Sequence, residues 1–184
     1  MSTTNSPNRI ELDQEGNLIF QSYFIIDLLL NLRRNDFINS DYFDKMVLEF
    51  PLIKDQLKIT NIDNQGMVLI TLYAMLVIPK EIMQNNFIVE FEVINLKLSS
   101  YCKNTQTTYK SDSSRTDYVK HLRNAISHGR ISFEPNQYLK FEDQLNNQTF
   151  ASELPLAKIP EFINDLREIH KKYISNKNAI LQTE

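Results

Sequence analysis

Apolar side chains recur every three or four residues over most of the chain, which is typical of amphipathic helices. The predicted helices cover residues 18–34, 42–57, 64–78, 86–101 and 115–127, and a last helix has an inner face running from Ile159 to Tyr173. The stretch 86–101 is ambiguous, because its first half is rich in residues that favour strands. Its length and its spacing of Phe87, Phe91, Ile94 and Leu98 favour a helix. The pattern therefore predicts a mainly helical fold.

Local signals place the ends of several of these helices. Pro51 predicts a kink or break within 42–57. Asp63 is a candidate N-cap for the helix 64–78, which is apolar nearly all round and should be central and buried. Pro79 ends or bends that helix. Residues 103–114 are polar and are predicted to form a loop.

The pattern after residue 130 alternates with a period of two residues. The stretches that begin at Ile131, Tyr138 and Gln148 are predicted strands, and Pro135-Asn136 and Asn146-Asn147 supply the turns between them. Ser113 or Ser114 can cap the helix that precedes them, and Gly129 can end it. These strands predict a small antiparallel meander placed before the last helix.

The expected fold class is all-α, a bundle of about five or six helices with a β insertion at about 131–153. A chain of 184 residues is one domain's worth, and residues 9–175 are assigned to it. Residues 1–8 are polar and are predicted to be disordered, and 176–184 form a polar tail.

The amino-acid composition indicates the cellular compartment in which the protein is expected. Cys102 is the only cysteine, so neither an intramolecular disulfide nor a cysteine-based zinc site is expected. No basic and apolar leader is visible, and the longest apolar stretch, 67–78, is shorter than a membrane helix. We therefore expect a cytoplasmic protein with no membrane partner.

The net charge of −3 argues against a polyanion partner, but residues 101–130 hold 6 Lys/Arg and only 2 Asp/Glu. A solvated helix face beside a loop explains that positive segment equally well.

The positive segment contains the run His121-Leu-Arg-Asn-Ala-Ile-Ser-His-Gly-Arg130. An arginine, a polar residue and a histidine at Arg123, Asn124 and His128, late in a helical chain, resemble the signature of the HEPN superfamily. The following glycine, strands and terminal helix resemble a bacterial, plasmid- or phage-defence-associated subgroup of it. The resemblance implies a compact helical domain, usually a homodimer, and many such domains are metal-independent ribonucleases. A ribonuclease of this kind can serve as a toxin or defence component.

The residue types suit that chemistry on physical grounds. RNA cleavage requires the 2′-oxygen to attack the neighbouring phosphorus, and a histidine can move protons near neutral pH. An arginine offers a charged donor fork to the phosphate, and Asn124 can bind a phosphate oxygen or orient the imidazole. No cofactor or metal is required. The catalytic candidates are therefore Arg123, Asn124 and His128.

Helix geometry complicates this site. On a regular helix Arg123 and His128 lie about 140° apart around the axis, so they do not share a face, whereas Asn124 and His128 nearly do. The long Arg123 side chain can reach around the helix, or the helix can unwind before Gly129. Alternatively, two copies of the chain meet so that each contributes part of one cleft. The HEPN resemblance implies this dimeric arrangement.

Nearby residues add candidates and alternatives. The predicted RNA contacts are Lys110, Arg115, Lys120, His121 and Arg130. His121 and His128 could form a metal pair, but no third ligand is apparent, and adjacent helix positions point Ser127 away from His128. His170 is expected to be a surface histidine or one with its hydrogen bonds satisfied.

In the plainest alternative, Arg123 and His128 only bind helix carbonyls or carboxylates. A non-catalytic module that binds RNA, a nucleotide or a protein, and a toxin held silent by a regulatory partner protein, also fit the sequence.

Overall fold

The computed structural model describes residues 13–181, so the predicted disorder of residues 1–8 lies outside the described part. The described residues form eight α-helices: α1 Gln14–Arg34, α2 Asp41–Lys45, α3 Pro51–Thr60, α4 Gln65–Leu72, α5 Lys80–Asn86, α6 Ile88–Tyr101, α7 Tyr118–Ser127 and α8 Ile159–Leu181. They also form four strands: β1 Lys103–Thr107, β2 Ile131–Glu134, β3 Tyr138–Leu145 and β4 Gln148–Pro155. Mainly helical structure with a small antiparallel sheet agrees with the predicted class.

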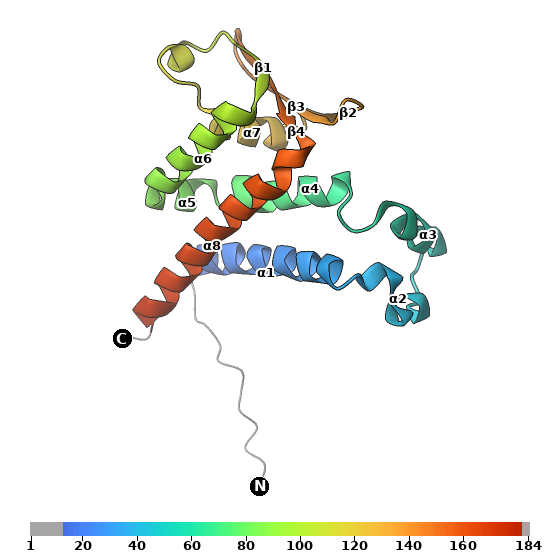
Figure 1. Cartoon of the computed structure of the whole chain (residues 1–184). Helices are drawn as coiled ribbons and strands as arrows, with labels where there is room; N and C mark the ends of the chain where they lie inside the picture. The colour runs from blue at the N-terminus through green and yellow to red at the C-terminus, as the bar shows by residue number, and fades with distance from the viewer. Residues whose placement is uncertain (1–12, 182–184) are drawn as a thin grey trace.

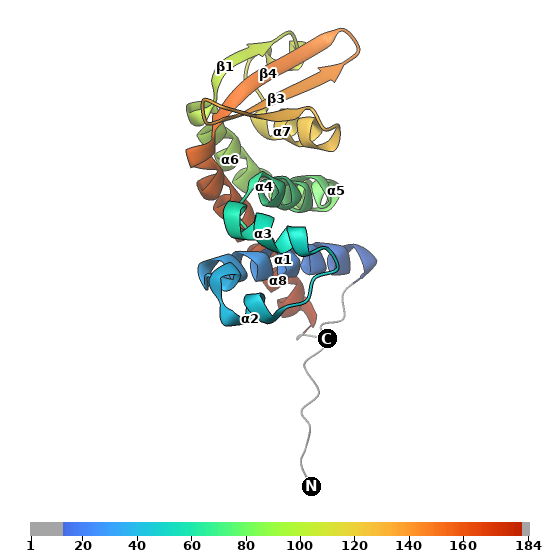
Figure 2. The same ribbon diagram turned by 90° about the vertical axis from the view of Figure 1, so that its right-hand side faces the viewer.

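The elements stack in layers (Figures 1 and 2). The sheet lies at one end with α7 against it, α4 and α5 form the next layer, and α1 lies beyond them. Helices α6 and α8 run across these layers along one side, and α2 and α3 project from one end. Helix α7 is thus held between the sheet and the helical core.

The central segment is the apolar stretch after residue 64. It forms α4 and continues as one π-helical turn, Tyr73–Val77, before Pro79. Leu72 and Met75 are almost completely buried in it, as predicted, although Ile70 and Tyr73 are exposed. The N-cap is Asn64, whose Oδ1 accepts a hydrogen bond from the Met67 N–H at 3.1 Å.

Several predicted boundaries were wrong by a few residues. Asp63 does not cap α4, because its carboxylate pairs instead with Arg33 at 2.8 Å. The break predicted at Pro51 is confirmed, because the stretch 42–57 contains two helices and Pro51 occupies the first turn of the second one. Helix α7 starts later than predicted, since Asp117 rather than Ser113 or Ser114 caps it through the Lys120 N–H.

The sheet has the order β1-β4-β3-β2 and is antiparallel throughout. The meander β2-β3-β4 agrees with the alternation pattern. The loop prediction for 103–114 was wrong, because β1 pairs with β4 there and a short 3₁₀ helix follows at Lys110–Ser113. The sheet is therefore built from segments on both sides of α7 and is not a single insertion at 131–153.

The chain end also differs from the prediction. Helix α8 continues to Leu181, so residues 176–181 are helical and not a free tail. Its inner face is buried along five positions: Ile159, Phe162, Leu166, Ile169 and Tyr173. In the described part of the chain, no helix combines the length and apolar character that crossing a bilayer needs.

Candidate active site at the C-terminal end of α7

Helix α7 ends in a Schellman motif, which sets the surroundings of His128. The His128 N–H donates to the Asn124 carbonyl at 3.0 Å, and the Arg130 N–H reaches back to the Ala125 carbonyl at 2.8 Å. Gly129 adopts the left-handed conformation that this reversal needs, with φ of 64°. The helix is therefore regular up to its end, and the unwinding considered as one solution does not occur. The His128 side chain is exposed, one turn beyond Asn124.

Arg123 lies on a different side of α7 and is buried, with 7% of its surface exposed. Its Nη1 donates to the Gln84 Oε1 of α5 at 2.6 Å, and its Nη2 approaches the Asn124 Oδ1 at 3.4 Å. Apolar side chains of Leu76 and Met83 line the small hollow beside it. The structure thus brings Arg123 to Asn124 but leaves His128 separate from it, as the helical angle predicts.

Asn124 links this arginine to the sheet. Its Nδ2 donates to the Asp143 Oδ2 of β3 at 3.0 Å. Both ends of the amide are therefore engaged by protein groups, one by Arg123 and the other by Asp143. The amide holds a fixed orientation at the base of the turn that carries His128.

His121 is completely buried between two carboxylates. Its Nδ1 lies 2.7 Å from the Asp143 Oδ2, and its Nε2 lies 3.0 Å from the Asp112 Oδ2. The ring stacks on Phe150 with centroids 4.1 Å apart. In this structure RNA has no access to His121, which corrects its assignment as an RNA contact. The physical reason is that two buried carboxylates need a donor between them.

The same placement separates His121 from His128, so the histidine pair considered for a metal is not assembled. One ring is enclosed in the core and the other is exposed at the helix end. Among residues 13–181 with described side chains, no three His, Cys, Asp or Glu groups are arranged to hold a metal ion.

The buried polar network has a defined electrostatic state. Burial by itself would raise the pKa of Asp143, but hydrogen bonds from His121 and Asn124 outweigh it and hold that pKa below its usual range. Burial, together with the charges of Asp143 and Asp112, raises the pKa of Tyr109 to about 12. Asp143 is therefore ionised and Tyr109 neutral at physiological pH.

The remaining basic candidates lie at the surface. Lys110 and Arg130 are exposed, Arg130 donates to the Gln144 carbonyl at 3.2 Å, and Lys120 lies over the Tyr109 ring at 5.8 Å. Arg115 is also exposed, in a loose ion pair with Glu92 at 3.8 Å.

Arg115 borders a hollow of about 360 Å³ between α5, α6 and the segment before α7. Gln84, which holds Arg123, lines the same hollow. This hollow connects one predicted RNA contact with the surroundings of the predicted catalytic arginine.

Sequence reasoning missed three side chains of this site: Gln84, Asp112 and Asp143. Asp143 had a signal, because it follows Leu139 and Phe141 at an inward position of β3, where a carboxylate needs a partner. No sequence signal marked Gln84 or Asp112, because a polar residue is common both in a short helix and in a polar segment.

Comparison with known proteins gives one positive result. A family model described as HEPN pEK499 p136 matches residues 1–177, which includes Arg123, Asn124 and His128. No curated protein and no solved structure matches the chain significantly. Because the family model covers nearly the whole sequence, the chain belongs to the HEPN pEK499 p136 family, within the HEPN superfamily.

Proposed function

We propose that this protein is a HEPN-type endoribonuclease that cleaves RNA without a metal ion. The observation that carries the proposal is the position of the motif in a chain that matches a HEPN family along residues 1–177. Its histidine is exposed at a well-formed helix end, and its arginine and asparagine are held in a hydrogen-bonded network directly below.

The proposed reaction is an internal phosphoryl transfer. The 2′-oxygen of one nucleotide bonds to its 3′-phosphorus, the bond from phosphorus to the 5′-oxygen of the next nucleotide breaks, and a 2′,3′-cyclic phosphate remains. One proton leaves the 2′-hydroxyl and one is added to the departing 5′-oxygen, and His128 supplies or removes one of them. Arg123 stabilises the charge that grows on the phosphate oxygens.

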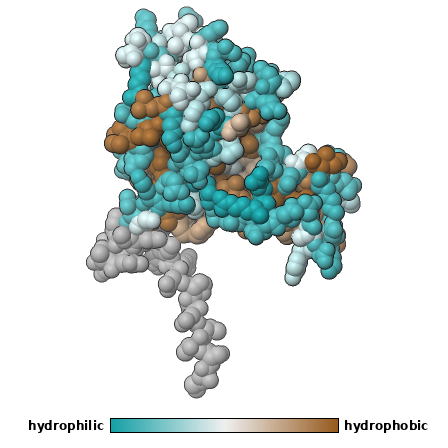
Figure 3. All heavy atoms as spheres, viewed as in Figure 1, coloured by the Kyte–Doolittle hydropathy of each residue, from teal (hydrophilic) through white to brown (hydrophobic). Residues whose placement is uncertain are grey.

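This chemistry requires Arg123 and His128 to act on one phosphate, although they lie on different sides of α7. A second copy of the chain solves the problem if it presents its His128 to the Arg123 of the first copy. The described surface offers a candidate face for such a copy on α6, where Ile88, Val89, Val93 and Leu96 are each at least half exposed. Apolar surface is visible at the α5–α6 corner in Figure 3.

The α6 face is also suitably placed. Ile88 lines the hollow that contains Gln84 and Arg115, so a copy docked on α6 comes next to the Gln84–Arg123 pair. Contiguous exposed apolar surface of this kind typically marks an interface. We therefore propose a homodimer in which each active site takes residues from both copies.

The direct test is RNA cleavage in the presence of EDTA with purified protein. We expect cleavage to persist and to leave 2′,3′-cyclic phosphate ends. His128→Ala should lower the rate by about 10²–10⁴-fold, the usual contribution of a general acid or base. Arg123→Lys keeps the charge but removes the planar fork, and should lower the rate by about 10²-fold.

Ser127→Ala is the matched control, because Ser127 is exposed on the last turn of the same helix. It should retain wild-type activity. Undiminished cleavage by both Arg123→Ala and His128→Ala, in folded protein, would refute the proposed catalytic roles.

One observation favours a second candidate, a HEPN-like module that binds RNA without cleaving it. Arg123 and Asn124 already hydrogen-bond to Gln84 and Asp143, so the free chain does not present their donors to a phosphate. In that case RNA binds, Arg115→Ala and Arg130→Ala weaken binding, and no cleavage appears at any protein concentration. Cleavage that rises with dimer formation distinguishes the first candidate.

We also propose a toxin or defence role, in which a regulatory partner protein holds the dimer silent. Expression of the wild-type chain alone should then arrest growth, and expression of His128→Ala should not. Equal growth arrest by both would contradict this role.

A further inference from the structure

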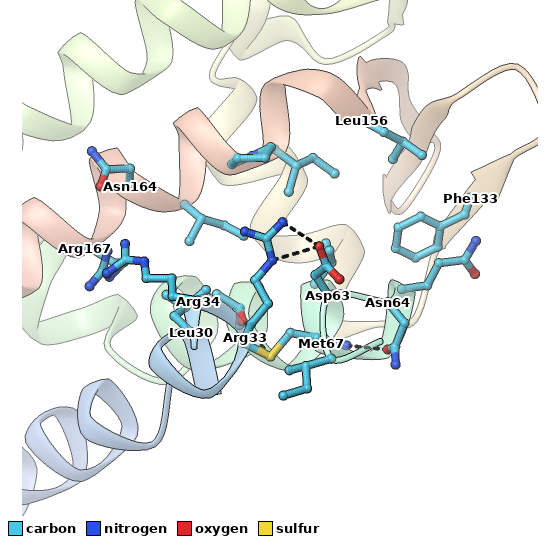
Figure 4. A pocket seen from close by; sticks show the side chains of 17 residues that line it. Leu30, Arg33, Arg34, Asp63, Asn64, Met67, Phe133, Leu156, Asn164 and Arg167 are labelled. Carbon is cyan, nitrogen blue, oxygen red and sulfur yellow. Dashed lines mark hydrogen bonds and ion pairs between the residues drawn. The ribbon is translucent and has the colours of Figure 1, made fainter. Parts of the chain in front are cut away.

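A second hollow in the described structure lies away from the HEPN motif. It measures about 430 Å³ and lies between the C-terminal end of α1, the start of α4, the start of α8 and β2 (Figure 4). Arg123, Asn124 and His128 do not line it. The volume is within the range of about 300–1,000 Å³ that is common for small-molecule sites.

One part of the pocket is apolar. Its wall includes Leu30 of α1, Met67 of α4, Phe133 of β2 and Leu156 just before α8. These four side chains come from distant parts of the sequence and are buried or half-buried. A hydrocarbon or aromatic group would gain by leaving water here.

The other part is cationic. Arg33, Arg34 and Arg167 all line the pocket, and Asp63 is the only carboxylate among the described lining residues. Asp63 is neutralised by Arg33, with the Arg33 Nη2 at 2.8 Å and the Arg33 Nε at 3.0 Å from its Oδ2. Arg167 pairs with Asp27, which does not line the pocket, so the net positive charge of the pocket comes from Arg34.

Arg34 and Arg167 retain unused hydrogen-bond donors. Arg167 is 7% exposed and pairs with Asp27 through its Nη2, but its buried Nε–H has no hydrogen-bond partner. Arg34 is exposed and has no carboxylate partner within the described residues. Figure 4 shows Arg34 and Arg167 at the same end of the pocket. Native proteins rarely leave a buried guanidinium donor unused.

We propose that this pocket binds a small amphipathic anion, with an apolar body against the Leu30–Met67–Phe133 wall and a carboxylate or phosphate at Arg34 and Arg167. Arginine recognises either anion because its planar donor fork fits two oxygens. The start of α4 adds to this, because Asn64 and Gln65 line the pocket and a helix N-terminus favours negative charge. This ligand site is independent of the proposed RNA cleavage.

The test uses a fluorescent pair that differs only in charge. The probe 8-anilinonaphthalene-1-sulfonate carries an apolar body and one anionic group, and N-phenyl-1-naphthylamine is the same body without the charge. We expect the folded wild-type chain to bind the anionic probe at one site per chain. Arg34→Gln should weaken its binding about tenfold or more, because a charge-assisted contact is lost, and should change binding of the neutral probe little.

Two further variants control this result. Val68→Phe narrows the pocket from α4 and should weaken binding of both probes, and Lys171→Gln removes an exposed cation of α8 outside the pocket and should alter neither. Displacement by phenyl phosphate, by 3-phenylpropanoate and by neutral 3-phenylpropanol then shows which anion is preferred. Anionic displacers should be at least tenfold more effective than the alcohol.

Three results would overturn the proposal. They are equal binding of both probes, binding unaffected by both Arg34→Gln and Val68→Phe, and several probe molecules bound per chain. Far-UV circular dichroism and a cooperative unfolding transition establish that each variant is folded before binding is compared.

Discussion

At the scale of single residues, the most consequential side chain is His121. It bridges Asp112 and Asp143 with no surface exposed, and Thr107 completes the cluster by donating to the Asp112 Oδ2 at 2.7 Å. Two carboxylates this close repel each other unless a donor lies between them. His121 therefore holds β3 and the 3₁₀ helix against α7.

Removing that donor should destabilise the protein strongly. We expect His121→Ala to lower the free energy of unfolding by about 3–5 kcal/mol, because it leaves buried charges uncompensated. Urea denaturation at pH 7 measures this. His128→Ala is the control, because that side chain is exposed and its loss should change the free energy of unfolding by less than about 0.5 kcal/mol. Equal effects of the two substitutions would contradict the role given to His121.

His170 makes folding depend on pH. The ring is buried against Tyr23, its Nδ1 lies 2.9 Å from the Leu166 carbonyl, and its Nε2 has no hydrogen-bond partner. It is therefore a core histidine and not a surface one, with one of its two ring nitrogens unsatisfied. Burial lowers the pKa of His170 below its ordinary value of 6.5, in spite of the Leu166 carbonyl.

The direction of this pH dependence of stability follows from proton uptake. As pH falls below about 6.5, the unfolded chain gains a proton that the folded chain does not accept, so the contribution of His170 to stability is complete above that pH and is lost below it. The loss is at most about 1.4 kcal/mol per pH unit. His170→Gln removes this titration, so the stability difference between wild type and variant should shift in favour of the variant between pH 7.5 and 5.5. A difference independent of pH would show that His170 titrates normally.

At the scale of elements, the end of α7 depends on Gly129. Its φ of 64° is unfavourable for other residues, and a Cβ built there meets no atom within 4 Å. Gly129→Ala should therefore cost about 1–2 kcal/mol through backbone strain alone. Gly129→Asn should cost less, because asparagine tolerates this conformation better. Thermal unfolding of both variants tests the order, and equal losses would indicate a packing effect instead.

The sequence predicted most elements because their patterns reflect burial on one face. Buried and more exposed positions alternate along β3 and β4 because one face of the sheet packs against helices, β3 against α7 and β4 against α6. The terminal helix shows its stripe at Phe162, Leu166 and Ile169. Strand β1 could not be found this way. It is a polar strand at the edge of the sheet, and it forms a strand because it pairs with β4, which lies about 45 residues later in the sequence.

The site was predictable to a smaller degree. The motif residues could be proposed as a site because their chemical types and spacing are informative, and Gly129 was correctly predicted to end the helix. The partners of Arg123 and His121 could not be, because Gln84, Asp112 and Asp143 meet α7 only through tertiary contacts. Spacing did predict correctly that Arg123 and His128 lie on different sides of the helix.

At the scale of the whole molecule, that separation determines how the protein can act. In one copy Arg123 is held against α5 by Gln84, and His128 is exposed one helical turn after Asn124. If two copies share each active site, Arg123 of one chain works with His128 of the other. The variants Arg123→Ala and His128→Ala, which we expect to be inactive, then lack complementary halves of the site.

Mixing these two variants should restore activity. After random exchange of subunits about half of the dimers contain one chain of each kind, and each mixed dimer has one intact site and one doubly defective site, so about a quarter of the wild-type rate should return. Either variant alone stays inactive at the same total concentration. If each site instead lay within one chain, every site in the mixture would lack one residue and the mixture would stay inactive. The rate of RNA cleavage in the mixture, measured against the separate variants, therefore decides between a shared and a self-contained active site.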